Sequence, residues 1–127
     1  MEQRNWHTSY DQGVPTAIDY EELTIPQVFR QTVENFPDAP ALIFLNCKLT
    51  YAEFGAEVDK CAIGFAHLGV KQGTRVAIQL PNIPQAAISY IAALQLGAEV
   101  VMTNPLYTFR ELEHQWKDSG CEIAVTM

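Results

Sequence analysis

The stretch that decides the fold runs from Lys71 to Thr108 and reads KQGTRVAIQLPNIPQAAISYIAALQLGAEVVMTNPLYT. It opens with a turn and a short apolar strand, and a Pro-Asn loop then leads into a helix over Ile83–Gly97. A second strand begins at Glu99. A strand, a helix and a strand joined by links of a few residues predict a right-handed crossover between parallel strands. This segment therefore indicates an α/β fold.

Capping boxes mark the starts of three helices outside the Ile83–Gly97 segment. A capping box places a Thr three residues before a Glu or Gln, so that each side chain bonds the other's backbone N–H. The three pairs are Thr24 with Gln27, Thr50 with Glu53, and Thr108 with Glu111. Helical spacing predicts which positions of these helices face the core. They are Val28, Thr32, Val33 and Phe36 in the first helix; Phe54, Val58, Cys61, Ala62, Phe65 and Leu68 in the second; and Phe109, Leu112 and Trp116 in the third.

The remaining segments complete the expected fold. Ala41–Leu45 is a short apolar strand, and a turn at Asn46-Cys47 predicts a hairpin with the strand that follows. The last strand is expected over Glu122–Thr126. We expect residues 1–22 to form an extended arm on the domain surface. Residues 23–127 are expected to form a three-layer α/β unit, a mostly parallel sheet with helices on both faces.

Composition and charge narrow the classes of function. The chain has 127 residues and a formal net charge of −7, which argues against nucleic acid as a partner. Three widely spaced cysteines, Cys47, Cys61 and Cys121, fit neither a disulfide framework nor a zinc site and favour reduced thiols in the cytoplasm. No apolar run approaches the ~20 residues that would span a bilayer.

The polar residues at the ends of two strands are the candidates for a ligand site. Asn82 and Asn104-Pro105 follow strands whose carboxyl ends could line a ligand path. The alternative, which we favour, is that each Asn caps the next helix and Pro fixes a turn. Gly64, Gly69 and Gly73 do not form a dinucleotide-binding pattern, and turn and packing roles explain them better.

The titratable residues point more clearly to structural roles. Glu53 and Glu57 lie one helical turn apart, but capping and a solvated face account for them better than a catalytic carboxylate pair. Cys61 falls in an apolar helix stripe and is expected to be a small buried hydrophobe rather than a nucleophile. His7, His67 and His114 are too far apart in sequence for a local metal site, and His114 is expected to be solvated.

The motifs resemble those of the adenylate-forming acyl-CoA synthetases, near their N-terminus. The matching segments are Leu49–Glu53, Gly69–Ile78, Leu80–Asn82, Asn104–Thr108, and Arg110–Gln115 with Asp118–Gly120. The arm resembles the long-chain fatty acyl-CoA synthetases through Trp6, Tyr10, Val14-Pro15 and Ile18. The resemblance covers roughly the whole chain. It implies the N-terminal part of a long-chain fatty acid–CoA ligase and a place in the large domain of that enzyme.

What the resemblance implies about activity belongs to a parent enzyme. Such an enzyme uses ATP with Mg²⁺ to form an acyl-adenylate from a fatty acid, and then transfers the acyl group to coenzyme A. The family's Ser/Thr/Gly-rich phosphate loop with its Lys, its adenine and ribose motifs and its C-terminal lysine do not occur in these residues. No catalytic, cofactor-binding or metal-binding residue can therefore be carried over, and we expect the chain alone to be inert.

A different class of function stays open, namely a free-standing α/β interaction or dimerisation module without enzymatic activity. The helix Ala86–Leu96 is almost free of polar residues and is too short to span a membrane. A core helix covered on both sides is the interpretation that we favour. The alternative is a contact with a membrane surface or a partner protein. An unpaired last strand would favour self-association, so we expect a homodimer.

Overall fold

The computed structural model describes residues 4–127 and confirms the expected order of elements after residue 23. In chain order the elements are η1 (Asn5–Ser9), α1 (Ile25–Asn35), β1 (Pro40–Phe44), β2 (Cys47–Thr50), α2 (Tyr51–His67), β3 (Arg75–Gln79), α3 (Pro84–Gln95), β4 (Glu99–Met102), α4 (Phe109–Ser119) and β5 (Ile123–Thr126).

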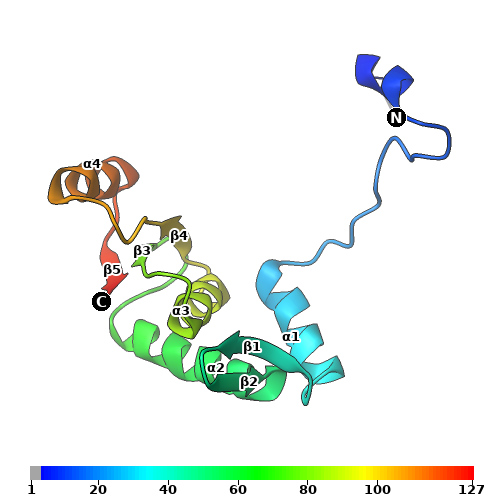
Figure 1. Ribbon diagram of the computed structural model, residues 1–127. Coiled ribbons are helices and arrows are strands. Elements are labelled where there is room, and N and C mark those ends of the chain that lie inside the picture. Colours follow the sequence, from blue (N-terminus) through cyan, green and yellow to red (C-terminus); the bar gives the residue numbers. More distant parts are fainter. Residues whose placement is uncertain (1–3) are drawn as a thin grey trace.

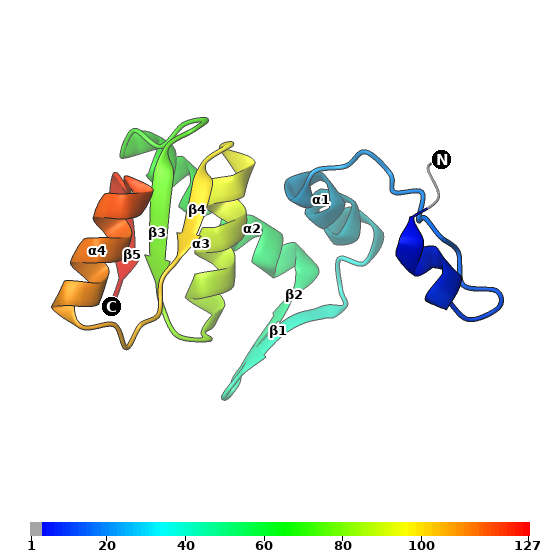
Figure 2. The same ribbon diagram turned by 90° about the horizontal axis from the view of Figure 1, so that it is seen from above.

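The three C-terminal strands form a parallel sheet in the order β4-β3-β5. The connection through α3 leads from β3 to β4, and the connection through α4 leads back past β3 to β5. Because the two crossovers run in opposite directions, right-handed connections place their helices on opposite faces of the sheet. Figures 1 and 2 show α4 on one face and α3 with α2 on the other. The predicted three-layer α/β fold is confirmed.

The core lies between the sheet and the helices α2 and α3. Val76, Ala77 and Ile78 of the central strand are fully buried, as expected for a parallel strand covered on both faces. Val58 of α2 and Ala92 of α3 are also fully buried. Every residue from 86 to 96 is buried or half-buried, which agrees with the expectation of a covered core helix. Small residues in α3 let this helix approach its neighbours closely.

All three predicted capping boxes are present, but the predicted core faces need correction. In α1 the buried residue is Phe29, with Val33 half-buried, while Val28 and Phe36 are exposed. Leu68 is 68% exposed because α2 ends at His67 and the chain turns away at Gly69 with φ of +90°.

Two further predicted core positions also differ from the structure. Phe109, the first residue of α4, is 80% exposed. Cys61 is only half-buried. The other predicted positions of α2, namely Phe54, Val58, Ala62 and Phe65, are buried. The helical period predicted for α2 was therefore correct, and the clear error was to extend it to Leu68, beyond the end of the helix.

The predicted hairpin forms with its turn one residue earlier than expected. β1 and β2 pair antiparallel, with Phe44 opposite Cys47. The turn therefore consists of Leu45 and Asn46, and Leu45 takes a positive φ of 51°. A two-residue turn at Asn46-Cys47 would instead have placed Leu45 opposite Lys48 and moved the partner of each β1 residue by two positions.

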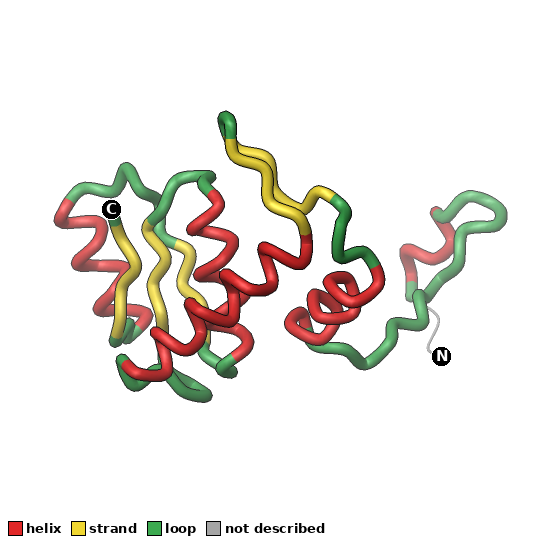
Figure 3. Tube along the Cα trace, turned by 90° about the horizontal axis from the view of Figure 1, so that it is seen from below, coloured by secondary structure: helices red, strands yellow, loops and turns green. Residues whose placement is uncertain are grey.

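The N-terminal arm differs in part from the extended segment that we expected. Residues 5–9 form the 3-10 helix η1, in which Trp6 packs edge-on against His7, and the chain beyond Tyr10 has no regular secondary structure before α1. All residues from 4 to 22 except His7 are exposed. The arm extends away from the other elements rather than along their surface (Figures 1 and 3). None of the helices found in residues 4–127 has the length and apolar character needed to cross a bilayer.

Candidate functional site

The carboxyl ends of β3 and β4 are the position in this fold where a ligand is most expected. The two strands are neighbours, and their exit loops lead to helices on opposite faces of the sheet. Such a divergence leaves a crevice outside the strand ends, where open α/β sheets bind ligands. The loops that border it are residues 80–83 and 103–108, which contain both Asn82 and Asn104.

Asn104 has a structural role, but in a turn and not as the helix cap that we favoured. Its Oδ1 accepts a hydrogen bond from the backbone N–H of Leu106 at 3.0 Å, and its carbonyl oxygen accepts one from Tyr107 at 3.1 Å. These bonds form a turn that directs the chain from β4 into α4. The α4 helix itself is capped by Thr108, four residues later. Asn104 therefore shapes the loop and does not cap the helix directly.

Asn82 does not cap α3, so this part of the prediction is wrong. The N-cap residue of α3 is Ile83, which makes no side-chain cap, and Pro84 at the first helical position has no N–H to satisfy. Asn82 is exposed and borders a cavity of about 270 Å³. The other lining residues come from β1 and from the start of α3, and they are Leu42, Ile43, Phe44, Ile83, Pro84, Ala86 and Ala87.

The chemistry of this cavity is that of an apolar surface with one amide at its rim. None of its lining residues is a carboxylate, an imidazole, a thiol or an amine, so it holds no nucleophile, general acid or general base. Among residues 4–127, no three His, Cys, Asp or Glu side chains come together as a metal site. The residues that line this cavity include no Lys or Arg to hold a nucleotide phosphate and no carboxylate to hold Mg²⁺.

The two glutamates singled out in the sequence have separate structural partners. Hydrogen bonds from the backbone N–H of Thr50, and then from its hydroxyl, hold the pKa of Glu53 below its usual range. Glu57 Oε1 pairs instead with Lys60 Nζ at 2.6 Å. One carboxylate therefore caps α2 and the other forms a surface ion pair, which agrees with the structural interpretation.

The remaining candidates are also accounted for by local structure. Burial raises the pKa of the Cys61 thiol, an effect that a hydrogen bond with Ser89 only partly offsets, so Cys61 is a poor nucleophile. Gly69 and Gly73 have φ of +90° and +81° in the turns before β3, where a residue with a Cβ would be strained. His114 is exposed on α4, as expected.

Sequence reasoning missed the contacts that join distant elements. Arg30 in α1 pairs with Asp59 in α2, and Gln95 of α3 donates from Nε2 to Asp59 Oδ1 at 3.0 Å. Trp116 Nε1 donates to the buried Thr103 Oγ1 at 3.2 Å, which fixes α4 over β4. No spacing within one helix reveals such pairs, because each partner lies on a different element.

Known proteins resemble this chain over most of its length. A family model described as AMP-binding enzyme matches residues 29–127. The chain is 35% identical over 125 residues to a long-chain-fatty-acid–CoA ligase of Bacillus subtilis (strain 168), in a match that covers 98% of this chain and 22% of the relative. It is 32% identical to a mitochondrial medium-chain acyl-CoA ligase of Danio rerio, ACSF2, over 93% of this chain and 20% of the relative.

Solved structures show the same relationship. The N-terminal subdomain of Klebsiella oxytoca NpsA, in complex with 3-hydroxyanthranilyl-AMSN, superposes with a TM-score of 0.78 and 26% identity, over 80% of this chain and 26% of that one. The inhibitor-bound N-terminal domain of FACL13 from Mycobacterium tuberculosis gives a TM-score of 0.77 and 28% identity, with the same coverage. The chain spans about a fifth of the length of the curated relatives it matches. Its sequence and fold together show that the chain belongs to the AMP-binding enzyme family, and that it corresponds to a part of the N-terminal subdomain of adenylate-forming enzymes.

Proposed function

We propose that this chain is the N-terminal part of a long-chain fatty acid–CoA ligase. The observation that carries the proposal is the 35% identity to the Bacillus subtilis long-chain enzyme, which extends over 98% of the chain. The match includes the arm as well as the sheet, since only about two of the 127 residues fall outside it.

The proposed activity of the whole enzyme is the ATP-dependent activation of a fatty acid. With Mg²⁺, ATP and the acid would give an acyl-adenylate and pyrophosphate, and coenzyme A would then take the acyl group. Residues 23–127 would contribute part of the large domain, and residues 1–22 an arm outside it. The thiols of Cys47, Cys61 and Cys121, none of them in a disulfide, suit the cytoplasmic location that we propose.

The role proposed for this segment is structural support, with no reaction of its own. The strand ends carry amides and backbone groups, and the adjacent cavity is apolar. Apart from the amide of Asn82, the side chains that line the cavity are apolar, and none of them is a cation or a titratable group. Within an enzyme, the loops 80–83 and 103–108 would border the ligand crevice and α3 would support the sheet beneath it.

A domain-exchange experiment tests this proposal. The matching segment of the Bacillus subtilis ligase is replaced by residues 1–127, and acyl-CoA formation is measured with palmitate, decanoate and acetate. We expect the exchanged enzyme to fold and to prefer long acyl chains to acetate. A control exchange uses the corresponding segment of the Danio rerio medium-chain ligase. A folded hybrid that is inactive on every acid, beside an active control hybrid, would contradict the proposal.

A further inference from the structure

Thr103 is the junction between β4 and the loop of residues 103–108. It is buried, with only 4% of its surface exposed. Its backbone N–H donates to the carbonyl oxygen of Ile78 at 3.0 Å, so the residue still bonds to β3 although β4 has ended. Its Oγ1 donates to the carbonyl oxygen of Val101 at 3.3 Å and accepts a hydrogen bond from Trp116 Nε1 at 3.2 Å. The sheet, the loop and α4 therefore meet at one residue.

The other end of the loop belongs to α4. Thr108 caps this helix: its backbone N–H donates to Glu111 Oε2 at 2.7 Å, and its carbonyl oxygen accepts from the N–H of Leu112 at 3.0 Å. The loop thus leaves β4 at Thr103 and enters α4 at Thr108, with the turn of Asn104 between them. A displacement of α4 relative to β4 would change the distance between the two ends of this short loop.

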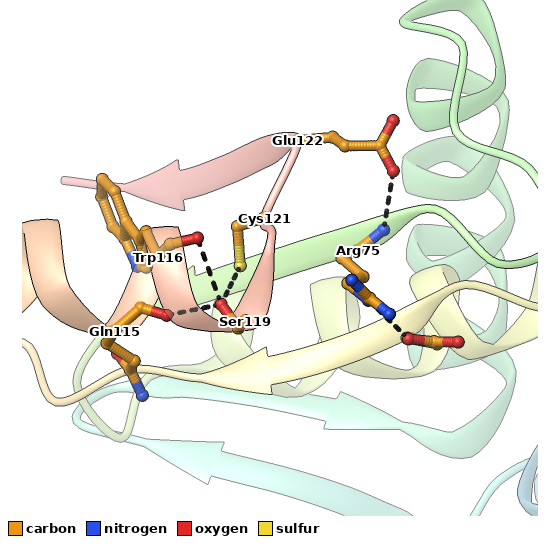
Figure 4. Close-up of polar contacts among 7 residues, drawn as sticks. Arg75, Gln115, Trp116, Ser119, Cys121 and Glu122 are labelled. Atoms are coloured by element: carbon orange, nitrogen blue, oxygen red, sulfur yellow. Dashed lines mark hydrogen bonds and ion pairs between the residues drawn. The ribbon is translucent and has the colours of Figure 1, made fainter.

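The last turn of α4 is fixed independently of the loop. Figure 4 shows Ser119 bonded to the carbonyl groups of Gln115 and Trp116, at 2.6 Å and 3.4 Å from its Oγ. Just beyond the helix, the N–H of Glu122 donates to the carbonyl oxygen of Arg75, the first residue of β3, at 3.0 Å. These contacts anchor the end of α4 to the amino end of the central strand.

Two side chains of this anchored helix reach the carboxyl end of β4. Gln115 donates from Nε2 to the carbonyl oxygen of Met102 at 3.2 Å, and Trp116 donates to the hydroxyl of Thr103. The two bonds together hold α4 against the strand end at which the loop begins. The first bond ends on a backbone carbonyl, which any donor could use. The second needs an indole at residue 116 and a hydroxyl at residue 103, so it depends on the identity of both side chains.

We propose that Thr103 and Trp116 are positioning residues for the ligand crevice, because their hydrogen bond sets the place of the loop 103–108 at the carboxyl ends of β3 and β4. This inference rests on the function proposed above, in which the loop borders the crevice of a fatty acid–CoA ligase. Neither side chain needs to touch a ligand. A binding site has to hold its groups within about 0.5 Å of the productive geometry, and a 1 Å misplacement can cost about 100-fold in rate.

Exchange of the indole N–H protons tests the hydrogen bond itself in the 127-residue chain. The chain has two tryptophans, and Trp6, which is 54% exposed, is the internal reference for Trp116. We expect the Trp116 proton to exchange about tenfold more slowly than that of Trp6, since a net hydrogen bond corresponds to a factor of this size. T103V keeps the shape of the residue without its hydroxyl and should remove most of the difference. T103S keeps the hydroxyl and should preserve it. Equal Trp116 exchange in T103V and in the unaltered chain would overturn the proposal.

Steady-state kinetics of the hybrid enzyme described above test the consequence for the site. T103V and W116F should each raise the KM of at least one substrate, among the fatty acid, ATP and coenzyme A, by about tenfold. The kcat should change by less than about twofold, since the reacting groups lie elsewhere in the enzyme. A mere loss of folded enzyme would instead lower the apparent kcat and leave KM unchanged. The double variant should be no worse than either single variant, because both remove the same bond.

Two control variants separate positioning from stability. T103S should retain the KM values of the unaltered hybrid. R30M removes the ion pair that joins α1 to Asp59 of α2 and should leave every KM unchanged, although it also costs stability. An active hybrid in which T103V and W116F leave all three KM values unchanged, or in which R30M raises them equally, would overturn this inference alone. A folded hybrid that is inactive before any of these changes, beside an active control hybrid, would overturn the proposed function and this inference with it.

Discussion

Arg30 of α1 and Asp59 of α2 form a two-pronged ion pair that joins the first helix to the rest of the fold. Arg30 Nη1 donates to Asp59 Oδ2 at 3.1 Å, and Nη2 bonds Oδ1. The hydrogen bonds from Arg30, and then from Gln95, hold the pKa of Asp59 below its usual range. One carboxylate therefore connects α1, α2 and α3, although its two partners lie 29 and 36 residues away in sequence.

This pair predicts a loss of stability in acid. A carboxylate whose pKa is lowered by folding stabilises the fold fully above its unfolded pKa of about 3.9, and loses that contribution as the pH falls through the folded value. Because both side chains are more than a third exposed, we expect about 1 kcal/mol or less. Urea unfolding at pH 7 and pH 3 checks this. The wild-type chain should lose more stability than R30M, and an equal loss would contradict the role of the pair.

Gly55 lies where α1 and α2 approach each other closely. A Cβ added there would stand 3.2 Å from Val33 Cγ1, which is tighter than ordinary contact. We expect G55V to destabilise the chain by about 1–3 kcal/mol through overpacking, measured by chemical unfolding. G64A in the same helix is the matched control, because nothing lies within 4 Å of its added Cβ. G64A should stabilise by up to about 1 kcal/mol, since Ala is the better helix former; similar effects of both changes would refute the packing argument.

Gly120 ends α4 in the left-handed region with φ of +65°. A side chain there is strained, and a Cβ would stand 2.8 Å from Arg75 Nη1. We expect G120A to cost about 1 kcal/mol and G120N less, since Asn tolerates this conformation better than Ala. Thermal unfolding of the two variants gives the comparison. The control measures G120A in an R75A background as well. If G120A cost no stability there, the steric contact with Arg75 would explain the whole effect and the backbone explanation would be wrong.

The isolated chain is expected to have no adenylation activity. ATP–pyrophosphate exchange should stay at background with palmitate, acetate or an aromatic acid, because the cavity between β1 and α3 offers no cationic and no titratable side chain. The exchange assay is run beside a no-protein blank and the intact Bacillus subtilis enzyme. Exchange above the blank, in a preparation free of other ligases, would show that this segment carries an adenylation site of its own.

Local signals in the sequence were sufficient for most of the fold. Each capping box involves residues three apart, so its geometry is set within one turn of helix; Thr50 and Glu53 form it as predicted. The apolar run of β3 likewise predicted a central strand, because a strand covered on both faces is where such a run is expected. The family resemblance also rested on short segments and is confirmed by the match over residues 29–127.

The candidate site was harder to predict, because a residue's role there depends on its neighbours. Asn82 and Asn104 look alike in sequence, each at the end of a strand. The structure closes Asn104 into a turn with Leu106 and leaves Asn82 at the rim of an apolar cavity. The walls of that cavity come from β1 and α3, which are far apart in the chain. No local pattern spans such a separation.

The sequence by itself determined the starts of the three capped helices, because each cap joins residues three apart. Short links between the C-terminal elements also predicted a parallel sheet, and short motifs predicted the family. Only the tertiary structure decided which flank of each helix is buried and which surfaces stay open. The amphipathic period of α4 predicts a buried Phe109, yet this first residue of the helix is 80% exposed. Burial is a property of packing between distant segments, and the local sequence does not encode which of those segments meet.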